Sequence, residues 1–159
     1  MRFFTMAWWR DVQSGSGVNP SDAYERHLAS LRPFPSAVAD LDRVPSLHDA
    51  RVRRVENVES SVELTLERWG ERGGWIPTWL SYRGVEHLSL STDPDGQLPG
   101  PGGFGDLGSY EIDTTAPGLF EHRFLFSSGV ELCVRFRSFT FRGDAVQPGV
   151  AADGAEPRR

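Results

Sequence analysis

The sequence contains no lysine, and all 17 of its strongly basic residues are arginines. Isoleucine and asparagine occur only twice each, whereas alanine, glycine and valine are abundant. This combination is typical of the codon bias of a GC-rich genome, so the number of arginines carries little functional information. The formal net charge of −5 disfavours a general nucleic-acid-binding role, which needs a basic surface.

Cysteine is also scarce. The single cysteine, Cys133, excludes an internal disulfide and fits a reducing compartment. No apolar run is long enough to form a signal peptide or to cross a bilayer. At 159 residues the chain has the length of one domain with its own hydrophobic core. We therefore expect a cytoplasmic, single-domain protein.

The first part of the chain, residues 1–44, predicts helices. Thr5 is a suitable N-cap for a first helix, in which Phe4 packs on Trp9. Asn19, followed by a proline, is a typical start of a second helix. A third short helix or turn follows before the pattern changes.

From residue 47 onwards, apolar and polar residues alternate as in half-buried strands. The first two strands form a hairpin, and a third runs over residues 78–90, where Gly84 indicates a bulge or bend. Residues 91–108 are rich in glycine and proline and predict a long loop. The tail, residues 143–159, lacks periodicity and is predicted to be disordered.

The segment LFEHRFLFSSGVELCVRFRSFTF gives the most specific structural prediction. A three-residue loop ending at Gly129 keeps the apolar faces of both strands on one side and places glycine at a left-handed position. In that register Phe120 faces Phe136, and Glu121 faces Arg135. Together these patterns predict an α+β domain over residues 1–142, with two or three N-terminal helices packed on an antiparallel sheet of about five to six strands.

Adjacent to the first strand, His48 and Asp49 could supply metal ligands, or a general base and its neighbour. His122 or His87 would have to complete such a site, but no histidine lies at a recognisable metal-ligand spacing. Because neighbouring residues on a strand point to opposite faces, we favour a structural interpretation. In it, Asp49 binds backbone amides and His48 is buried under the helices. We expect neither a metal nor a cofactor.

Tryptophan is plentiful for a domain of this size, with five in the chain. Trp69, Trp75, Trp79 and Tyr82 occur close together around a glycine-containing segment. Trp and Tyr are enriched at binding hot spots, although aromatic residues also dominate hydrophobic cores. We predict that these four residues form a surface for a partner protein.

At FFTMAWW and SLHDARV the chain resembles a group of small, uncharacterised bacterial proteins. These open with an aromatic-Phe-Thr-x-x-Trp-Trp signature and continue through a Tyr…His-Leu helix, here residues 24–28, into Ser-Leu-His-Asp-Ala. The likeness spans most of residues 1–142. It implies an α+β fold and a bacterial cytosolic setting, but no activity and no catalytic residues. The small size and acidic charge are also similar to those of immunity proteins of toxin systems.

The favoured hypothesis is a non-enzymatic protein-binding module, such as an immunity or accessory factor of a bacterial toxin or defence system. The alternative is a metal-dependent or hydrolytic enzyme that uses His48 and Asp49 with His122 or His87. The two hypotheses differ in geometry. Histidines that converge with a carboxylate in an open cleft favour the enzyme, whereas a buried His48 favours the binding module.

Overall fold

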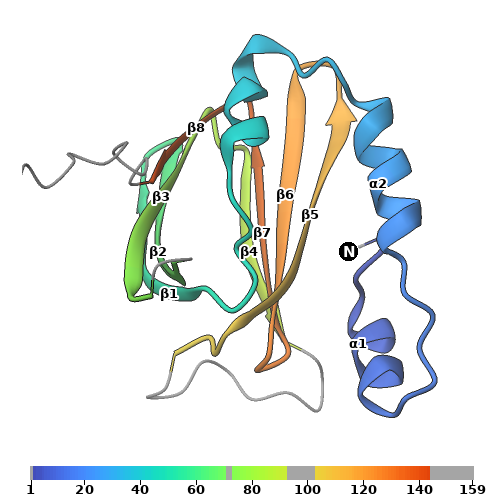
Figure 1. Ribbon diagram of the computed structural model, residues 1–159. Coiled ribbons are helices and arrows are strands. Elements are labelled where there is room, and N and C mark those ends of the chain that lie inside the picture. The colour runs from blue at the N-terminus through green and yellow to red at the C-terminus, as the bar shows by residue number, and fades with distance from the viewer. Residues whose placement is uncertain (1, 71–72, 93–102, 144–159) are drawn as a thin grey trace, which may run out of the picture.

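The computed structural model describes residues 2–70, 73–92 and 103–143, in which eight strands form two antiparallel sheets with helices along one side (Figure 1). Sheet A has the strand order β1-β2-β3-β8, and sheet B has the order β4-β7-β6-β5. The predicted α+β class is confirmed, but two four-stranded sheets replace the single sheet that was expected. The tail beyond residue 143, and residues 93–102 of the predicted loop, lie outside the described residues. The strands are β1 (Arg51–Val58), β2 (Ser61–Trp69), β3 (Trp75–Arg83), β4 (His87–Thr92), β5 (Leu107–Ala116), β6 (Leu119–Phe126), β7 (Val130–Phe136) and β8 (Ser138–Gly143).

The predicted helical segment contains two α-helices and a 3₁₀ helix. Thr5 caps the first, because its Oγ1 accepts a hydrogen bond from Trp8 N at 3.1 Å. Phe4 packs on Trp8, with ring centroids 5.2 Å apart, and not on Trp9 as predicted. At the second helix, Asn19 Oδ1 accepts from the Ser21 amide at 3.0 Å. The helices are α1 (Met6–Gln13), α2 (Ser21–Ser30) and η1 (Ser36–Arg43).

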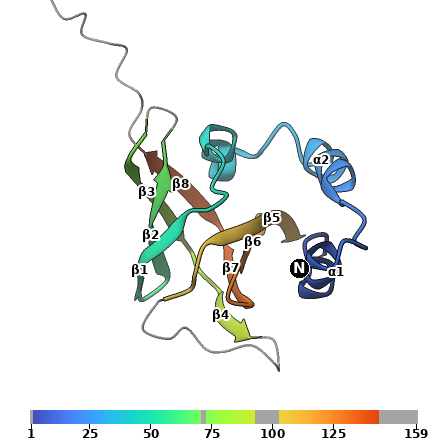
Figure 2. The same cartoon turned by 60° about the horizontal axis from the view of Figure 1, so that its bottom comes forward.

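The three helices occupy two different places. Helices α1 and α2 lie alongside sheet B, whereas η1 lies at one end of the space between the sheets (Figures 1 and 2). The Asp40 side chain attaches η1 to sheet A, since its Oδ2 accepts a hydrogen bond from Phe141 N at 3.1 Å. The Tyr24 hydroxyl attaches α2 to sheet B by accepting from Ile112 N at 3.0 Å.

The strand predicted over residues 78–90 is divided between the two sheets. At Gly84, with φ +61°, the chain leaves β3 in sheet A and continues as β4 in sheet B. The return from β7 to β8 occurs at Arg137, directly beside Gly84, where a Cβ added to the glycine would lie 3.0 Å from the arginine Cβ. Backbone hydrogen bonds join the two crossings, from Arg137 N to Arg83 O at 3.1 Å and from Glu86 N to Arg135 O at 2.9 Å. The predicted bend is therefore correct, but it is a corner shared by both sheets.

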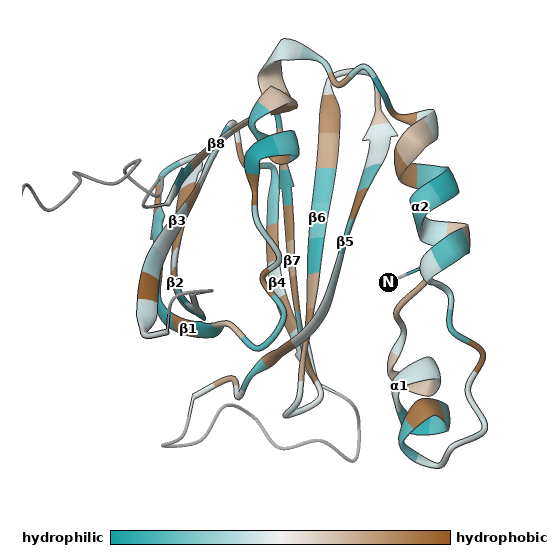
Figure 3. Cartoon of the chain, in the orientation of Figure 1, coloured by the Kyte–Doolittle hydropathy of each residue, from teal (hydrophilic) through white to brown (hydrophobic). Residues whose placement is uncertain are grey.

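The hydrophobic core fills the space between the sheets. Buried residues alternate with more exposed ones along β2 and β7, so each sheet turns one apolar face inward. Figure 3 shows apolar stretches (brown) on strands of both sheets. The buried inward-facing residues include Val62, Leu64, Leu66, Leu80, Tyr82 and Phe139 from sheet A, and Phe120, Phe124, Phe126, Leu132, Val134 and Phe136 from sheet B.

The register predicted for the β6–β7 hairpin is confirmed. Phe120 lies opposite Phe136, and Glu121 lies opposite Arg135. Gly129 has φ +83°, and its amide donates to the Phe126 carbonyl at 2.9 Å.

Candidate functional site

His48 and Asp49 occupy the exposed corner of a β-turn. The turn is closed by a hydrogen bond from Ala50 N to Leu47 O at 3.0 Å, and these two end residues are fully buried. Asp49 has φ +62°, a left-handed conformation that aspartate tolerates better than most residues. Its amide donates to Leu107 O at 2.8 Å and so connects the turn to the start of β5.

The structure contradicts the predicted environment of this pair. The side chains of His48 and Asp49 are 63% and 70% exposed, and His48 Nδ1 lies 3.1 Å from Asp49 Oδ2. They face each other because they lie in a turn, where the opposed directions of a strand do not apply. His48 is therefore not buried under the helices. The Asp49 carboxylate faces His48, whereas it was predicted to bind backbone amides.

The other two candidate histidines lie elsewhere. His122 is fully buried between the sheets, and its Nδ1 lies 2.9 Å from the Tyr82 hydroxyl. His87 is exposed at the start of edge strand β4, with Nε2 3.0 Å from Ser89 Oγ. The structure does not bring His48, His87 and His122 together. Within the described ranges, no group of three His, Cys, Asp or Glu residues could hold a metal ion.

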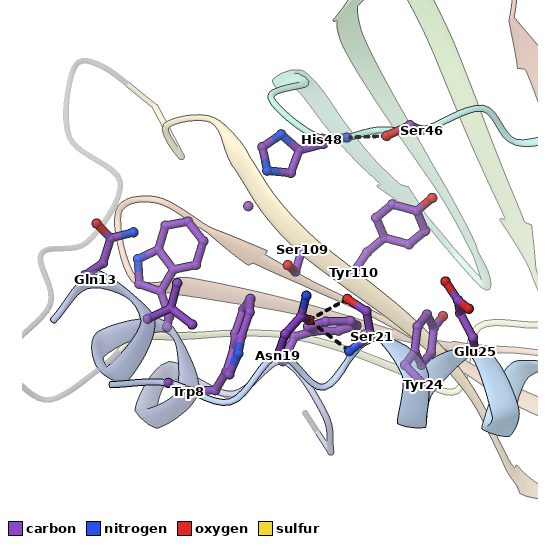
Figure 4. Close-up of a pocket in the computed structure, with 15 residues that line it drawn as sticks. Trp8, Gln13, Asn19, Ser21, Tyr24, Glu25, Ser46, His48, Ser109 and Tyr110 are labelled. Carbon is purple, nitrogen blue, oxygen red and sulfur yellow. Dashed lines mark hydrogen bonds between the residues drawn. The ribbon is translucent and has the colours of Figure 1, made fainter. Parts of the chain in front are cut away.

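His48 does contribute to a groove of about 830 Å³ between the N-terminal helices and β5. Figure 4 shows His48 and Ser46 on one side, facing the helical residues Trp8 and Tyr24 on the other. The His48 ring has Asp49 as its only polar contact within the described part of the chain. The groove therefore combines aromatic and polar walls with a solvent-exposed His-Asp pair.

Three of the four predicted partner-binding residues share the outer face of sheet A. Trp69 and Trp75 are cross-strand partners with ring centroids 5.5 Å apart, and they are 59% and 40% exposed. Trp79 lies on the same face of β3 and is half-buried. The Arg51 guanidinium lies 4.6 Å from the Trp75 ring centroid, and that of Arg142 lies 4.3 Å from the Trp79 centroid. We call Trp69, Trp75 and Trp79 the tryptophan face.

The fourth predicted residue, Tyr82, does not belong to this surface. It is fully buried on the inner face of β3, and its hydroxyl contacts His122. Trp79 and Tyr82 are separated by three positions, so on a strand they point to opposite faces. The two-residue period of the strand was a signal that could have excluded Tyr82 from the surface.

Sequence reasoning missed a buried carboxylate on the outer face of sheet B. Glu111 is only 3% exposed and accepts hydrogen bonds from the backbone amides of Phe3 at 2.9 Å and Phe4 at 3.4 Å. Arg123 lies 3.4 Å from the same carboxylate. Glu111 thereby holds the segment before α1 against the sheet. Nothing in the local pattern of β5 identifies this long-range contact.

Cys133 lies in the same charged region but is not an activated nucleophile. Burial and the nearby Glu121 carboxylate raise the pKa of the Cys133 thiol to about 11. The thiol therefore stays protonated at neutral pH, when nucleophilic attack requires the thiolate. The nearby Arg123 guanidinium favours the thiolate but does not reverse this effect.

Comparison of the chain with protein-family models, curated protein sequences and solved structures finds no match. Among the described residues, no helix has the length and apolar character needed to cross a membrane.

Proposed function

We propose that the protein is a non-enzymatic module that binds a partner protein through the tryptophan face. The observation that carries this proposal is the exposure of Trp69 and Trp75, at 59% and 40%, next to each other on one sheet face. Large aromatic side chains that stay accessible next to arginines are typical of the anchors at protein interfaces.

The arginines of this face indicate the chemistry of the partner. Arg53 and Arg54 on β1 are paired with Glu67 and Glu56, at 2.6 Å and 2.5 Å. Arg142, in contrast, contacts the Trp79 ring and is paired with no carboxylate in the described ranges. A partner segment that carries an acidic side chain would place its carboxylate beside this guanidinium and its apolar surface on the tryptophans.

The small size, the acidic net charge and the resemblance of FFTMAWW and SLHDARV to a bacterial family support a more specific role. We propose a cytoplasmic immunity or accessory factor of a bacterial toxin or defence system. A toxin gene beside the gene for this protein would support that role.

One observation favours a second function. The His48–Asp49 contact at the edge of the groove resembles a general base with its orienting carboxylate. A hydrolase built on this pair predicts that His48→Ala abolishes turnover, whereas Trp75→Ala leaves it unchanged. We prefer the binding function because both side chains are mainly exposed, where water screens their interaction.

The binding function is tested by capture and reconstitution. Proteins that bind the wild type in a host extract are identified, and the candidate partner is purified and titrated. We expect Trp75→Ala and Arg142→Ala each to weaken binding at least about tenfold, because central aromatic and arginine residues dominate interface energies. Leu90→Ala, at a 53% exposed position on sheet B, is the matched control and should bind like the wild type. Equal binding by all four proteins would show that the tryptophan face is not the interface.

A further inference from the structure

A second, smaller cavity lies among α2, the segment around η1 and the inner face of sheet B. Its volume is about 220 Å³, and the fully buried His122 forms part of its lining. Arg32 and Asp42 also line it; they are paired at 2.7 Å and are 52% and 46% exposed, which places them toward solvent. The apolar lining consists of Leu28, Phe34, Leu41, Val44 and Ile112.

The buried histidine has an unused hydrogen-bonding atom. Its Nδ1 lies 2.9 Å from the Tyr82 hydroxyl, whereas its Nε2 is buried and has no hydrogen-bond partner among the described residues. If Tyr82 donates to Nδ1, the only group left unsatisfied is the Nε2–H. The other tautomer would leave both the Tyr82 proton and the Nε2 lone pair without partners. We therefore assign the proton to Nε2, because buried polar groups are satisfied wherever possible.

The charge of the imidazole narrows the class of ligand further. Burial lowers the pKa of His122 to about 3, so the ring is neutral at physiological pH. A ligand carboxylate placed against it would lose its hydration without gaining a counter-charge. A neutral oxygen acceptor gains the hydrogen bond without that penalty.

We infer that this cavity binds a small, uncharged carbonyl compound with an apolar body, whose oxygen accepts a hydrogen bond from His122 Nε2. The body of the ligand packs against the apolar lining, and the Arg32–Asp42 pair lies at the solvent side. This site does not involve the tryptophan face, so its test is independent of the proposed binding of a partner protein.

The test uses two probes of nearly equal size and shape, acetophenone and ethylbenzene, of which only acetophenone carries an acceptor. Each is titrated into ¹⁵N-labelled full-length protein and followed by the amide signals of Leu28, Ile112 and His122. We expect acetophenone to bind about tenfold more tightly than ethylbenzene, because only acetophenone satisfies the buried donor. Equal affinity for the two probes, or no shift with acetophenone, would overturn the inference.

Two variants locate the site and the donor. His122→Phe keeps a flat ring but lacks the donor, so it should bind acetophenone no more tightly than ethylbenzene, because the carbonyl is then buried without a partner. Leu28→Trp, at a partly exposed position on α2, should fill the cavity and weaken binding of both probes while the His122–Tyr82 contact stays intact. If Leu28→Trp binds acetophenone like the wild type, the probe binds elsewhere and the inference is wrong.

Discussion

The two sheets present similar inner faces but very different outer faces. On sheet B, the outward-pointing Leu125 is fully buried and Glu111 is 3% exposed. The amides of Phe3 and Phe4 contact Glu111, and a Cβ added to Gly108 would lie only 2.9 Å from the Trp9 ring of α1. On sheet A, no helix of the described chain lies over the outer face, and Trp69 is 59% exposed (Figure 1). The N-terminal segment thus lies against the outer face of sheet B, whereas no described helix lies over the outer face of sheet A.

The largest expected effect compares one residue from each outer face. Leu125→Ala should destabilise the protein by about 2–5 kcal/mol, because it removes a fully buried side chain. Trp75→Ala, on the uncovered face, should cost about 1 kcal/mol, chiefly through its contact with Trp69. Urea unfolding of both variants measures the difference. Equal losses would mean that the tryptophan face is as structural as the covered face.

The carboxylate that anchors the N-terminal segment should have the next largest effect. Glu111→Ala should cost about 2 kcal/mol, because it leaves the amides of Phe3 and Phe4 without their acceptor and removes one of the two carboxylates beside Arg123. The matched change on sheet A, Glu63→Ala, should stay within about 0.5 kcal/mol of the wild type. Thermal melts give the stabilities, and limited proteolysis shows whether residues near α1 become accessible in Glu111→Ala. Retained protection of this segment would show that other contacts hold it.

On the inner faces, Tyr82 of sheet A and His122 of sheet B form a buried polar contact. Because burial lowers the pKa of His122 from 6.5 to about 3, the unfolded chain binds a proton between these values that the folded chain does not. The free energy of unfolding is therefore not reduced by His122 above pH 6.5. As the pH falls from 6.5 toward 3, protonation of the unfolded chain lowers it by about 1 kcal/mol per pH unit.

The control for this pH dependence is the double variant Tyr82→Phe/His122→Phe, which removes both partners and leaves no buried polar group unpaired. Its stability should fall less steeply than that of the wild type when denaturant unfolding is measured from pH 7 to pH 4. Parallel curves would place the acid sensitivity in other groups, such as Glu121, whose pKa is also lowered because Arg135 and Arg123 outweigh its burial.

The smallest effect is expected at the turn that joins the two sheets. His48→Ala should change the free energy of unfolding by less than about 0.5 kcal/mol, because the side chain is 63% exposed and its contact with Asp49 is screened by water. Chemical denaturation at neutral pH measures this change. A loss above 1.5 kcal/mol would mean that His48 has a structural role that its exposure does not indicate.

The local sequence pattern predicted individual strands and one hairpin, but it did not predict how the strands assemble into two sheets. The β6–β7 hairpin was predictable because the loop glycine, the apolar alternation and the Glu121–Arg135 pair all require one register. The division into two sheets was not, because each strand buries one face in either arrangement and its alternation looks the same. Gly84 marked the corner, but Arg137, which lies directly beside it, carries no such signal.

For the candidate sites too, the sequence predicted what depends on local pattern and missed what depends on contacts between distant segments. Trp75 and Trp79 share strand parity, so their common face follows from the sequence, and the same parity excludes Tyr82. His48 was misplaced because the turn from Leu47 to Ala50 depends on hydrogen bonds to β5, far away in the chain. The cavity at His122 required three separate elements to come together, which no local pattern describes.

The shared corner has a consequence for protein synthesis. Sheet A begins with β1, β2 and β3, but its fourth strand, β8, is the last to be made, after all of sheet B. A growing chain therefore carries the edge of β3 unpaired until residues 138–143 have been translated. Unpaired edges attract other strands, and pairing between distant segments is slow. A chain truncated before residue 138 would keep the β3 edge unpaired and would be prone to aggregation. Synthesis of β8 therefore both completes sheet A and removes an edge at which chains could associate.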